Sequence, residues 1–137
     1  MEDCVFCKII NGDIPSYKVY EDDNVLAFLD LTQGTKGHTL LIPKKHVENI
    51  YELDDATATQ VFTAVPKIAQ GLKDAFSPIG LNIVQNNDQP LQSVFHFHVH
   101  LLPRYDNDGM VLKTLNLQDH LQEEDYLSIQ NAIKSAL

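Results

Sequence analysis

The chain has 137 residues and is 44% hydrophobic, so we expect a single globular domain over residues 1–137. Its formal net charge of −9, from 10 Lys and Arg against 19 Asp and Glu, argues against a protein that wraps nucleic acid, because such proteins need a basic surface. The sequence has no apolar run that could span a membrane and no secretory signal, and we therefore expect a cytoplasmic protein that does not act at a membrane.

The first part of the chain predicts short strands. We expect strands over residues 18–21 and 25–30, joined by the polar turn 22–24, and a third strand over residues 38–43. Short strands joined by tight turns are typical of an antiparallel sheet.

The middle of the chain predicts one long helix followed by two more strands. Apolar residues recur every three to four positions from about residue 54 to 76, and Pro66 inside this segment predicts a kink or a later start. Residues 81–85 and 94–102 have the composition of strands, and the polar loop 86–92 separates them.

The end of the chain, about residues 116–137, predicts a helical tail, with the helix itself over about residues 119–136. Together these elements predict an α+β fold: a mostly antiparallel five-stranded sheet with one long helix and one C-terminal helix.

Three alternating histidines are the main chemical feature of the sequence. On a strand, side chains alternate between faces, so His96, His98 and His100 are expected on one face and the apolar residues between them, from Phe95 to Leu101, on the other. Such a row could bind a metal ion, or one neutral imidazole could attack phosphorus. The chain has no P-loop, and no carboxylate pair near the row could hold magnesium, which favours phosphorus chemistry.

Polar groups directly before the histidine row can serve that chemistry. Gln92 and Ser93 offer amide, hydroxyl and backbone donors to phosphate oxygens.

Two cysteines, Cys4 and Cys7, form a Cys-x-x-Cys pair near the start of the chain. Such a pair supplies half of a tetrahedral zinc site, and it can also be a redox pair or two free thiols.

The segment Gln92–Pro103 resembles the signature of the histidine triad (HIT) family, His-Φ-His-Φ-His-Φ-Φ, in which Φ is an apolar residue. Upstream, the segments Val5–Ile10, Ala27–Asp30 and Gly37–His46 are similar to further landmarks of the family in the same order. The resemblance covers about residues 4–104 and points to a bacterial type with an N-terminal Cys-x-x-Cys, similar to the Hint and Fhit branches.

The resemblance implies a HIT-like homodimer that hydrolyses nucleotides and needs no catalytic metal. His98 would attack the α-phosphorus of a purine nucleoside phosphoramidate or dinucleoside polyphosphate and carry the nucleotidyl group until water releases the nucleoside monophosphate. His100 would contact the phosphate and help to move protons, and His38 would lie in the supporting hydrogen-bond network. The family's transferase branch has glutamine in place of the third histidine, so His100 favours hydrolysis over transfer.

The resemblance also assigns the substrate contacts. Asp30 matches the carboxylate that binds ribose hydroxyls, and Asn86 and Ser93 match positions near the phosphate or the leaving group. The family's apolar base pocket falls on four residues that would otherwise be read as ordinary core: Phe6, Ile9, Phe28 and Leu31. Many members have glycine where this chain has Leu91, and the loop from Asn86 is one residue short of theirs. Because leucine adopts positive φ only at a cost, we expect either that the loop follows a different path or that its close approach to phosphate is altered.

For the cysteine pair, the resemblance names His46 and His96 as the two remaining ligands of a closed structural zinc site with Cys4 and Cys7. Two other functions stay open at this point. One is a nucleotide-binding regulatory module without turnover, and the other is a metal-binding protein that uses all three strand histidines on one ion.

Overall fold

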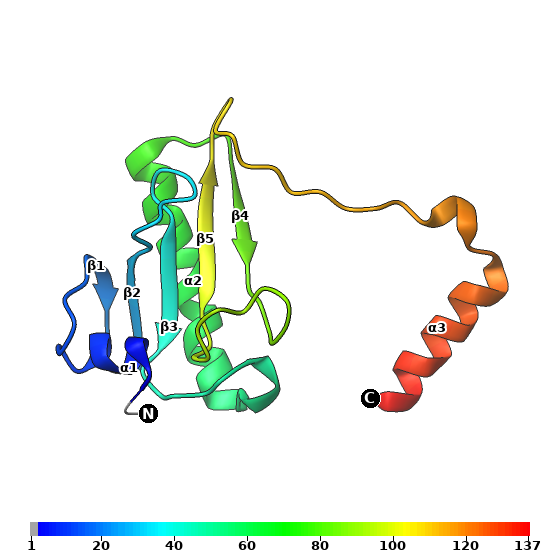
Figure 1. Cartoon of the computed structure of the whole chain (residues 1–137), viewed down its shortest axis with the longest axis horizontal. Coiled ribbons are helices and arrows are strands. Elements are labelled where there is room, and N and C mark those ends of the chain that lie inside the picture. The colour runs from blue at the N-terminus through cyan, green and yellow to red at the C-terminus, as the bar shows by residue number, and fades with distance from the viewer. Residues whose placement is uncertain (1–2) are drawn as a thin grey trace.

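The computed structural model describes residues 3–137, and an antiparallel five-stranded sheet forms the centre of its folded domain (Figure 1). The strands run in the order β1-β2-β3-β5-β4. Their bounds are β1 (Lys18–Glu21), β2 (Val25–Leu29), β3 (Thr39–Pro43), β4 (Gly80–Val84) and β5 (Val99–Arg104). The predicted α+β class and the number of strands are confirmed, and four strands lie within one residue of their expected bounds.

The long helix α2 (Asp55–Phe76) covers one face of the sheet and contacts β2, β3 and β5 (Figure 1). Asp54 caps its start by accepting a hydrogen bond from the backbone N–H of Thr57 at 2.8 Å. The helix includes Pro66, so the expectation of a later start is wrong. The side chains that recur at helical spacing are buried against the sheet: Val61, Val65, Ile68 and Leu72.

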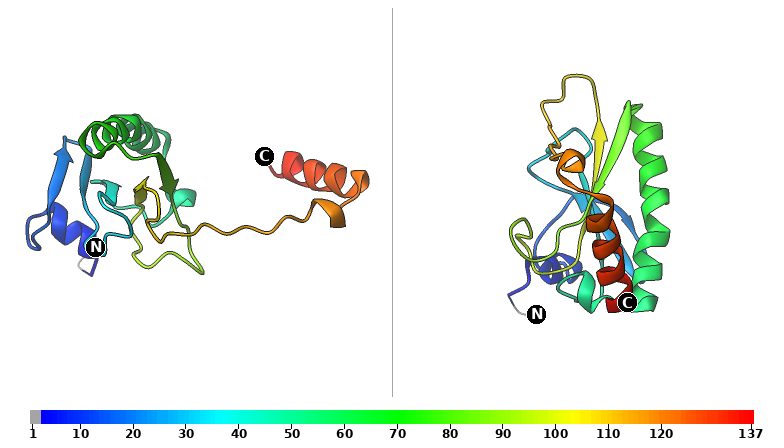
Figure 2. Two further views of the ribbon diagram at one scale, coloured as in Figure 1. Left: turned by 90° about the horizontal axis from the view of Figure 1, so that it is seen from above. Right: turned by 90° about the vertical axis from the view of Figure 1, so that its right-hand side faces the viewer.

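The opposite face of the sheet is covered by a short helix that the sequence did not predict, α1 (Val5–Ile10) (Figure 2). Phe6 and Ile9 from this helix pack in a second apolar cluster with residues of β2 and β3: Leu26, Phe28, Leu40 and Ile42. The sheet is therefore buried on both faces.

The predicted strand over residues 94–102 is wrong for its first half, because β5 begins only at Val99. The preceding segment pairs with the loop after β3 instead of with a neighbouring strand: the backbone N–H of Phe97 donates to the carbonyl of Val47 at 2.7 Å. His96 and His98 consequently lie in a connecting segment, and Phe95, expected on the apolar face, is exposed.

The C-terminal tail leaves the domain. After β5 the chain runs extended, forms a 3₁₀ turn at Gln118–His120 and ends in α3 (Glu123–Ala136), which stands well away from the sheet (Figures 1 and 2). The tail helix is thus confirmed, although its α-helical part starts four residues later than expected. Over residues 3–137, no helix combines the length and apolar character needed to cross a bilayer.

Candidate functional site

A cavity of about 690 Å³ opens on the α1 face of the sheet, which is within the usual size of a small-molecule site. Its walls include the four residues expected to form a base pocket: Phe6, Ile9, Phe28 and Leu31. Phe6, Ile9 and Phe28 also belong to the buried cluster, whereas Leu31 has an exposed fraction of 79%. The polar wall of the cavity is formed by Asp30, Ser93, His98 and His100. One cavity thus combines a large apolar wall with a few converging polar groups.

The ring of His98 is held in one tautomer. Its Nδ1 lies 2.7 Å from the carbonyl oxygen of His96, which can only accept, so Nδ1 carries the proton. Nε2 then carries a free lone pair, and His98 is one of the residues that line the cavity. Burial lowers the pKa of His98, which keeps the ring neutral and nucleophilic.

A chain of hydrogen bonds fixes the proton on His100. The backbone N–H of Gly34 donates to Nδ1 of His38 at 3.1 Å, which leaves the proton of neutral His38 on Nε2. That Nε2–H lies 2.9 Å from Nδ1 of His100 and donates to it. The proton of His100 is therefore on Nε2, where it can donate to a ligand. Burial, with repulsion from His98 and His38, lowers the pKa of His100 to about 4.

Asp30 lies beside this chain and is ionised. Thr32 donates to one carboxylate oxygen through its backbone N–H at 2.9 Å and its hydroxyl at 2.7 Å. Burial acts to raise the pKa of Asp30, but these bonds outweigh it and hold the pKa below its usual value. The other oxygen lies 3.5 Å from Nε2 of His38 and lies at the cavity wall, free to accept from a ligand.

Gln33 holds the loop between Asp30 and His38, and sequence reasoning missed it. Its side chain donates to the carbonyls of Asp30 at 2.7 Å and His38 at 2.8 Å, and it accepts from the N–H of Gly37 at 2.9 Å. Its φ of 44° is in the left-handed region. Glycine or asparagine would have signalled such a position, whereas glutamine gives no sequence signal.

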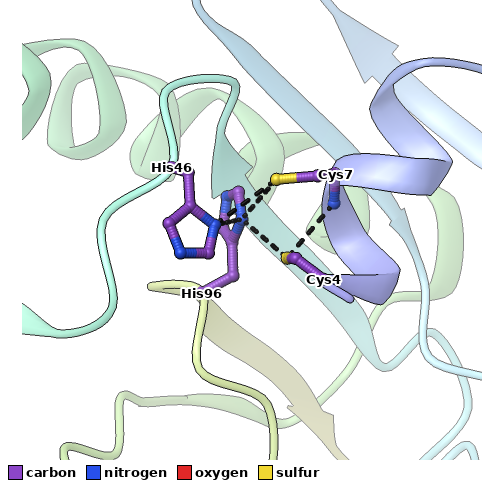
Figure 3. A group of neighbouring side chains, drawn as sticks. All are labelled: Cys4, Cys7, His46 and His96. Carbon is purple, nitrogen blue, oxygen red and sulfur yellow. Dashed lines mark hydrogen bonds between the residues drawn. The ribbon is translucent and has the colours of Figure 1, made fainter. Parts of the chain in front are cut away.

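The cysteine pair and two histidines form a compact cluster on the other side of α1 (Figure 3). Cys4 caps the start of α1, Cys7 lies in its first turn, His46 follows β3 and His96 precedes β5. The potential ligand atoms of these four residues all lie within 4.8 Å of one another. Three segments distant in sequence therefore meet at one point.

The spacing within this cluster matches a tetrahedral zinc site. Zinc–nitrogen bonds of about 2.0 to 2.1 Å and zinc–sulfur bonds of about 2.3 Å place two nitrogens about 3.3 Å apart and a nitrogen and a sulfur about 3.6 Å apart. The two imidazole Nδ1 atoms are separated by 3.2 Å. The nitrogen–sulfur distances are 3.4 Å for Cys4–His96, 3.4 Å for Cys7–His46 and 3.6 Å for Cys7–His96.

The surroundings of His96 and Cys7 also suit a cation. Nε2 of His96 donates to the carbonyl of Pro43 at 2.8 Å, so Nδ1 presents its lone pair to the cluster. Burial and the neighbouring Cys4 raise the pKa of Cys7 to about 11, so a cation is needed to hold the Cys7 sulfur as a thiolate at neutral pH. With four protein ligands the site would be closed, which is typical of structural zinc.

The three histidines of the row do not share one ion. Among residues 3–137, His96 falls in the cysteine cluster, His100 falls with Asp30 and His38, and His98 in neither. The hypothesis of one metal on all three histidines is therefore wrong. The second group is also poorly suited to a metal, because the N–H of Gly34 occupies Nδ1 of His38 and leaves a proton on the Nε2 that would have to bind the ion.

Two residues expected to contact phosphate lie elsewhere. Gln92 is buried, and its amide donates to the carbonyls of Glu48 at 2.6 Å and Val94 at 3.0 Å while accepting from the N–H of Asp88 at 2.7 Å. Within the described residues, neither Gln92 nor Asn86 lines the cavity. Gln92 instead ties the segment that carries His96 and His98 to the loop after β3.

The loop before this segment contains Leu91, and its turn is built on a different residue. Leu91 has an exposed fraction of 69%, and Asp88, with a φ of 55°, supplies the positive φ of the turn. The side chain of Asn49 donates to Asp88 at 2.9 Å and steadies that turn.

Comparison with known proteins gives a consistent result. A family model described as the HIT domain matches residues 11–107. A protein named Protein hit, from Bacillus subtilis, is 56% identical over 140 residues, covering 99% of this chain and 95% of its own length. An adenosine 5'-monophosphoramidase of Schizosaccharomyces pombe is 40% identical over 102 residues, covering 74% of each chain.

Solved structures agree with this comparison. A HIT family protein from Bacillus subtilis superposes with a TM-score of 0.96 at 54% identity, over 98% of this chain and 97% of its own. A HIT family protein from Bacillus anthracis gives 0.94 at 46% identity, over 99% and 98%. A zinc-bound histidine triad family protein from Mycobacterium smegmatis gives 0.76 at 31% identity, over 96% and 98%.

Proposed function

This chain belongs to the HIT domain family, and on that premise we propose that it is a cytoplasmic nucleotide hydrolase whose nucleophile is His98. Its substrates are nucleoside phosphoramidates or dinucleoside polyphosphates, and its product is a nucleoside monophosphate. The tautomer of His98 carries this proposal: the 2.7 Å hydrogen bond from Nδ1 to the carbonyl of His96 leaves a lone pair on Nε2 at the cavity wall.

The reaction has two displacements. Nε2 of His98 forms a bond to the α-phosphorus while the bond from phosphorus to the leaving group breaks, and the leaving group takes up a proton. Water then attacks the same phosphorus and gives up a proton to solvent, the phosphorus–nitrogen bond breaks with its electron pair returning to Nε2 of His98, and the nucleoside monophosphate leaves. The Nε2–H of His100 and the hydroxyl of Ser93 donate to phosphate oxygens as negative charge builds on them.

The rest of the cavity selects the nucleoside. The aromatic rings of Phe6 and Phe28, with centroids 5.5 Å apart, form one wall of the base pocket. A purine would lie against this wall, with the side chain of Leu31 on its other side. The free oxygen of Asp30 accepts hydrogen bonds from the ribose hydroxyls. The adenosine 5'-monophosphoramidase relative supports an adenylyl substrate with an amine leaving group.

We assign zinc to the cluster of Cys4, Cys7, His46 and His96 as a structural ion. A zinc-bound relative supports this assignment. The ion would tie α1 to the segments before β5 and after β3, and no step of the reaction uses it.

Turnover of two substrates without added metal tests the proposal. The purified protein is incubated with adenosine 5'-phosphoramidate and with a diadenosine polyphosphate, and AMP is measured by chromatography. We expect AMP from at least one substrate, and the ratio of the two rates identifies the preferred leaving group. If AMP binds to the protein but neither substrate is cleaved, the chain is a nucleotide-binding module and the proposal fails.

The pH dependence of kcat/KM should include the protonation of His100. The groups that face its ring are His38, His98 and Asp30, and the pKa of His100 is lowered to about 4. Above that pH the ring is neutral and accepts from His38, and a proton on Nδ1 would break this bond. Because burial lowers the pKa of the nucleophile His98 as well, we expect kcat/KM, measured as initial rates of AMP release, to stay constant from pH 8 through 6.5 and to fall only at lower pH, with the protonation of His100 near pH 4 completing the loss. A decline centred near 6.5, the pKa of a solvated histidine, would contradict this expectation.

A further inference from the structure

Both cysteines of the cluster can be reached from solvent. Cys4 and Cys7 are free and partly exposed. Cys7 also lines an open cavity of about 430 Å³, together with Lys8, Lys44 and His46. In the described part of the chain, this cavity shares no lining residue with the cavity proposed for the nucleotide. A small reagent can therefore reach the sulfur of Cys7 without competing with a nucleotide.

The two sulfurs are held close together at the start of α1 (Figure 3). The carbonyl of Cys4 accepts the first helical hydrogen bond, from the N–H of Lys8 at 3.1 Å, so Cys4 and Cys7 belong to one helical turn. The Sγ of Cys4 accepts from the N–H of Cys7 at 3.3 Å, and the two Sγ atoms lie within 4.8 Å of each other.

This arrangement allows a disulfide within the chain. Residues three apart in one α-helical turn have Cα atoms about 5 Å apart. Natural disulfides join Cα atoms separated by about 4.4 to 6.8 Å. Rotation of the side chains of Cys4 and Cys7 can therefore bring their sulfurs together while α1 stays helical.

We propose that Cys4 and Cys7 are a site of reversible oxidation, at which a peroxide forms an intramolecular disulfide that releases the metal and weakens nucleotide binding. As metal ligands both sulfurs are thiolates, the form that peroxides oxidise. Cys7 attacks one peroxide oxygen, the O–O bond breaks, and hydroxide leaves a sulfenic acid on Cys7. The thiolate of Cys4 then attacks this sulfur, the S–S bond forms and a second hydroxide leaves. The two sulfurs thus give two electrons to the peroxide.

The disulfide would empty the cluster because it removes both thiolate ligands. Only His46 and His96 then remain, with their Nδ1 atoms 3.2 Å apart. Two imidazoles are half of the four ligands that a structural zinc site needs. The ion should therefore leave on oxidation and return when the disulfide is reduced.

The effect on nucleotide binding rests on the function proposed above. Phe6 lies between the two cysteines in the chain and lines the nucleotide cavity. Its ring meets those of His96 and His98 edge-on, with centroids 5.9 Å and 5.2 Å away. Closure of the disulfide would move the turn that carries Phe6, and loss of the ion would release His96, whose carbonyl holds His98. Both changes act on the wall against which the nucleotide lies.

Peroxide treatment of the zinc-loaded full chain tests the site. Protein with one zinc per chain, verified by native mass spectrometry, is treated with hydrogen peroxide. Zinc release is followed with a chromogenic chelator, and free thiols and intact mass are measured. We expect one zinc released for each chain that loses both thiols and two hydrogen atoms. Dithiothreitol with added zinc should reverse the change, and this reversal is a control because oxidised methionine needs its own reductases.

Calorimetry of AMP binding measures the coupling without any need for turnover. Oxidised protein should bind AMP at least about tenfold more weakly than reduced protein and should recover on reduction. Cys7→Ser is the control: it cannot form the intramolecular disulfide, so peroxide should leave its AMP affinity unchanged. If this pattern is found but neither substrate is cleaved, the hydrolase fails and the oxidation site stands.

Four results would each overturn the proposal. They are a protein that cannot be loaded with zinc, a treated protein that keeps its zinc and thiols, oxidation to sulfinic acid or to a disulfide between chains, and equal AMP affinity of the oxidised and reduced forms.

Discussion

Replacement of His98 with alanine is expected to lower kcat/KM for the better of the two substrates by about four orders of magnitude or more, as is usual when a covalent nucleophile is removed. Among the described residues at the cavity wall, no other side chain presents an unprotonated nitrogen that is free: Nδ1 of His100 accepts from His38, and its Nε2 carries the proton. The measurement is AMP release in initial-rate assays, together with the intact mass of acid-quenched protein. Wild-type protein should show a mass increase of one nucleotidyl group during turnover, and the variant should show none.

The control for this experiment is nucleotide binding. His98 contacts the edge of the Phe6 ring, with centroids 5.2 Å apart, but the base wall and Asp30 do not depend on its imidazole. AMP should therefore bind the variant with an affinity within about tenfold of wild type by calorimetry, a difference of about 1.4 kcal/mol. Turnover within tenfold of wild type, or an adduct that persists in the variant, would remove His98 from the role of nucleophile.

The sequence predicted the layered fold well because its signals there are local. The apolar strands and the regular apolar spacing of residues 54–76 reflect the periods of strand and helix, and the bounds of α2 and of the first four strands agree with the expected ones within one residue. α1 escaped prediction because it has only six residues, Val5–Ile10, and its start is capped by Cys4, which is an uncommon capping residue.

The site was harder to predict where position depends on contacts between distant segments. The His-x-His-x-His pattern predicted one strand face, but a hydrogen bond from Phe97 to Val47 and the buried amide of Gln92 pull residues 94–98 away from strand pairing. This displacement separates His96, which faces the cysteines, from His98, which faces the cavity. The loop held by Gln33 and the position of Asn86 likewise depend on tertiary structure, and no short stretch of sequence contains the contacts that fix them.

Removal of the metal is expected to have the second large effect. If zinc is bound by Cys4, Cys7, His46 and His96 and free zinc exceeds the dissociation constant a thousandfold, the ion contributes about 4 kcal/mol to the free energy of unfolding. For a chain of this size, its loss should lower Tm by roughly 10 to 20 °C. We expect Cys7→Ser to lose zinc and to show this fall in calorimetry, with zinc counted by mass spectrometry. Lys8→Ser, an exposed neighbour in α1, is the matched control and should keep both the zinc and the Tm.

Zinc loss should also lower turnover, although the ion would lie outside the cavity. The backbone carbonyl of His96 holds the proton of His98, and Phe6 from α1 forms part of the cavity wall, so the cluster positions both the nucleophile and the base pocket. Chelation of the wild type should therefore reduce kcat and raise KM, and added zinc should restore both. Cys7→Ser should not be restored by the same zinc, because its fourth ligand is missing. If chelated protein has the kinetics and the Tm of the untreated protein, the cluster is not a structural metal site.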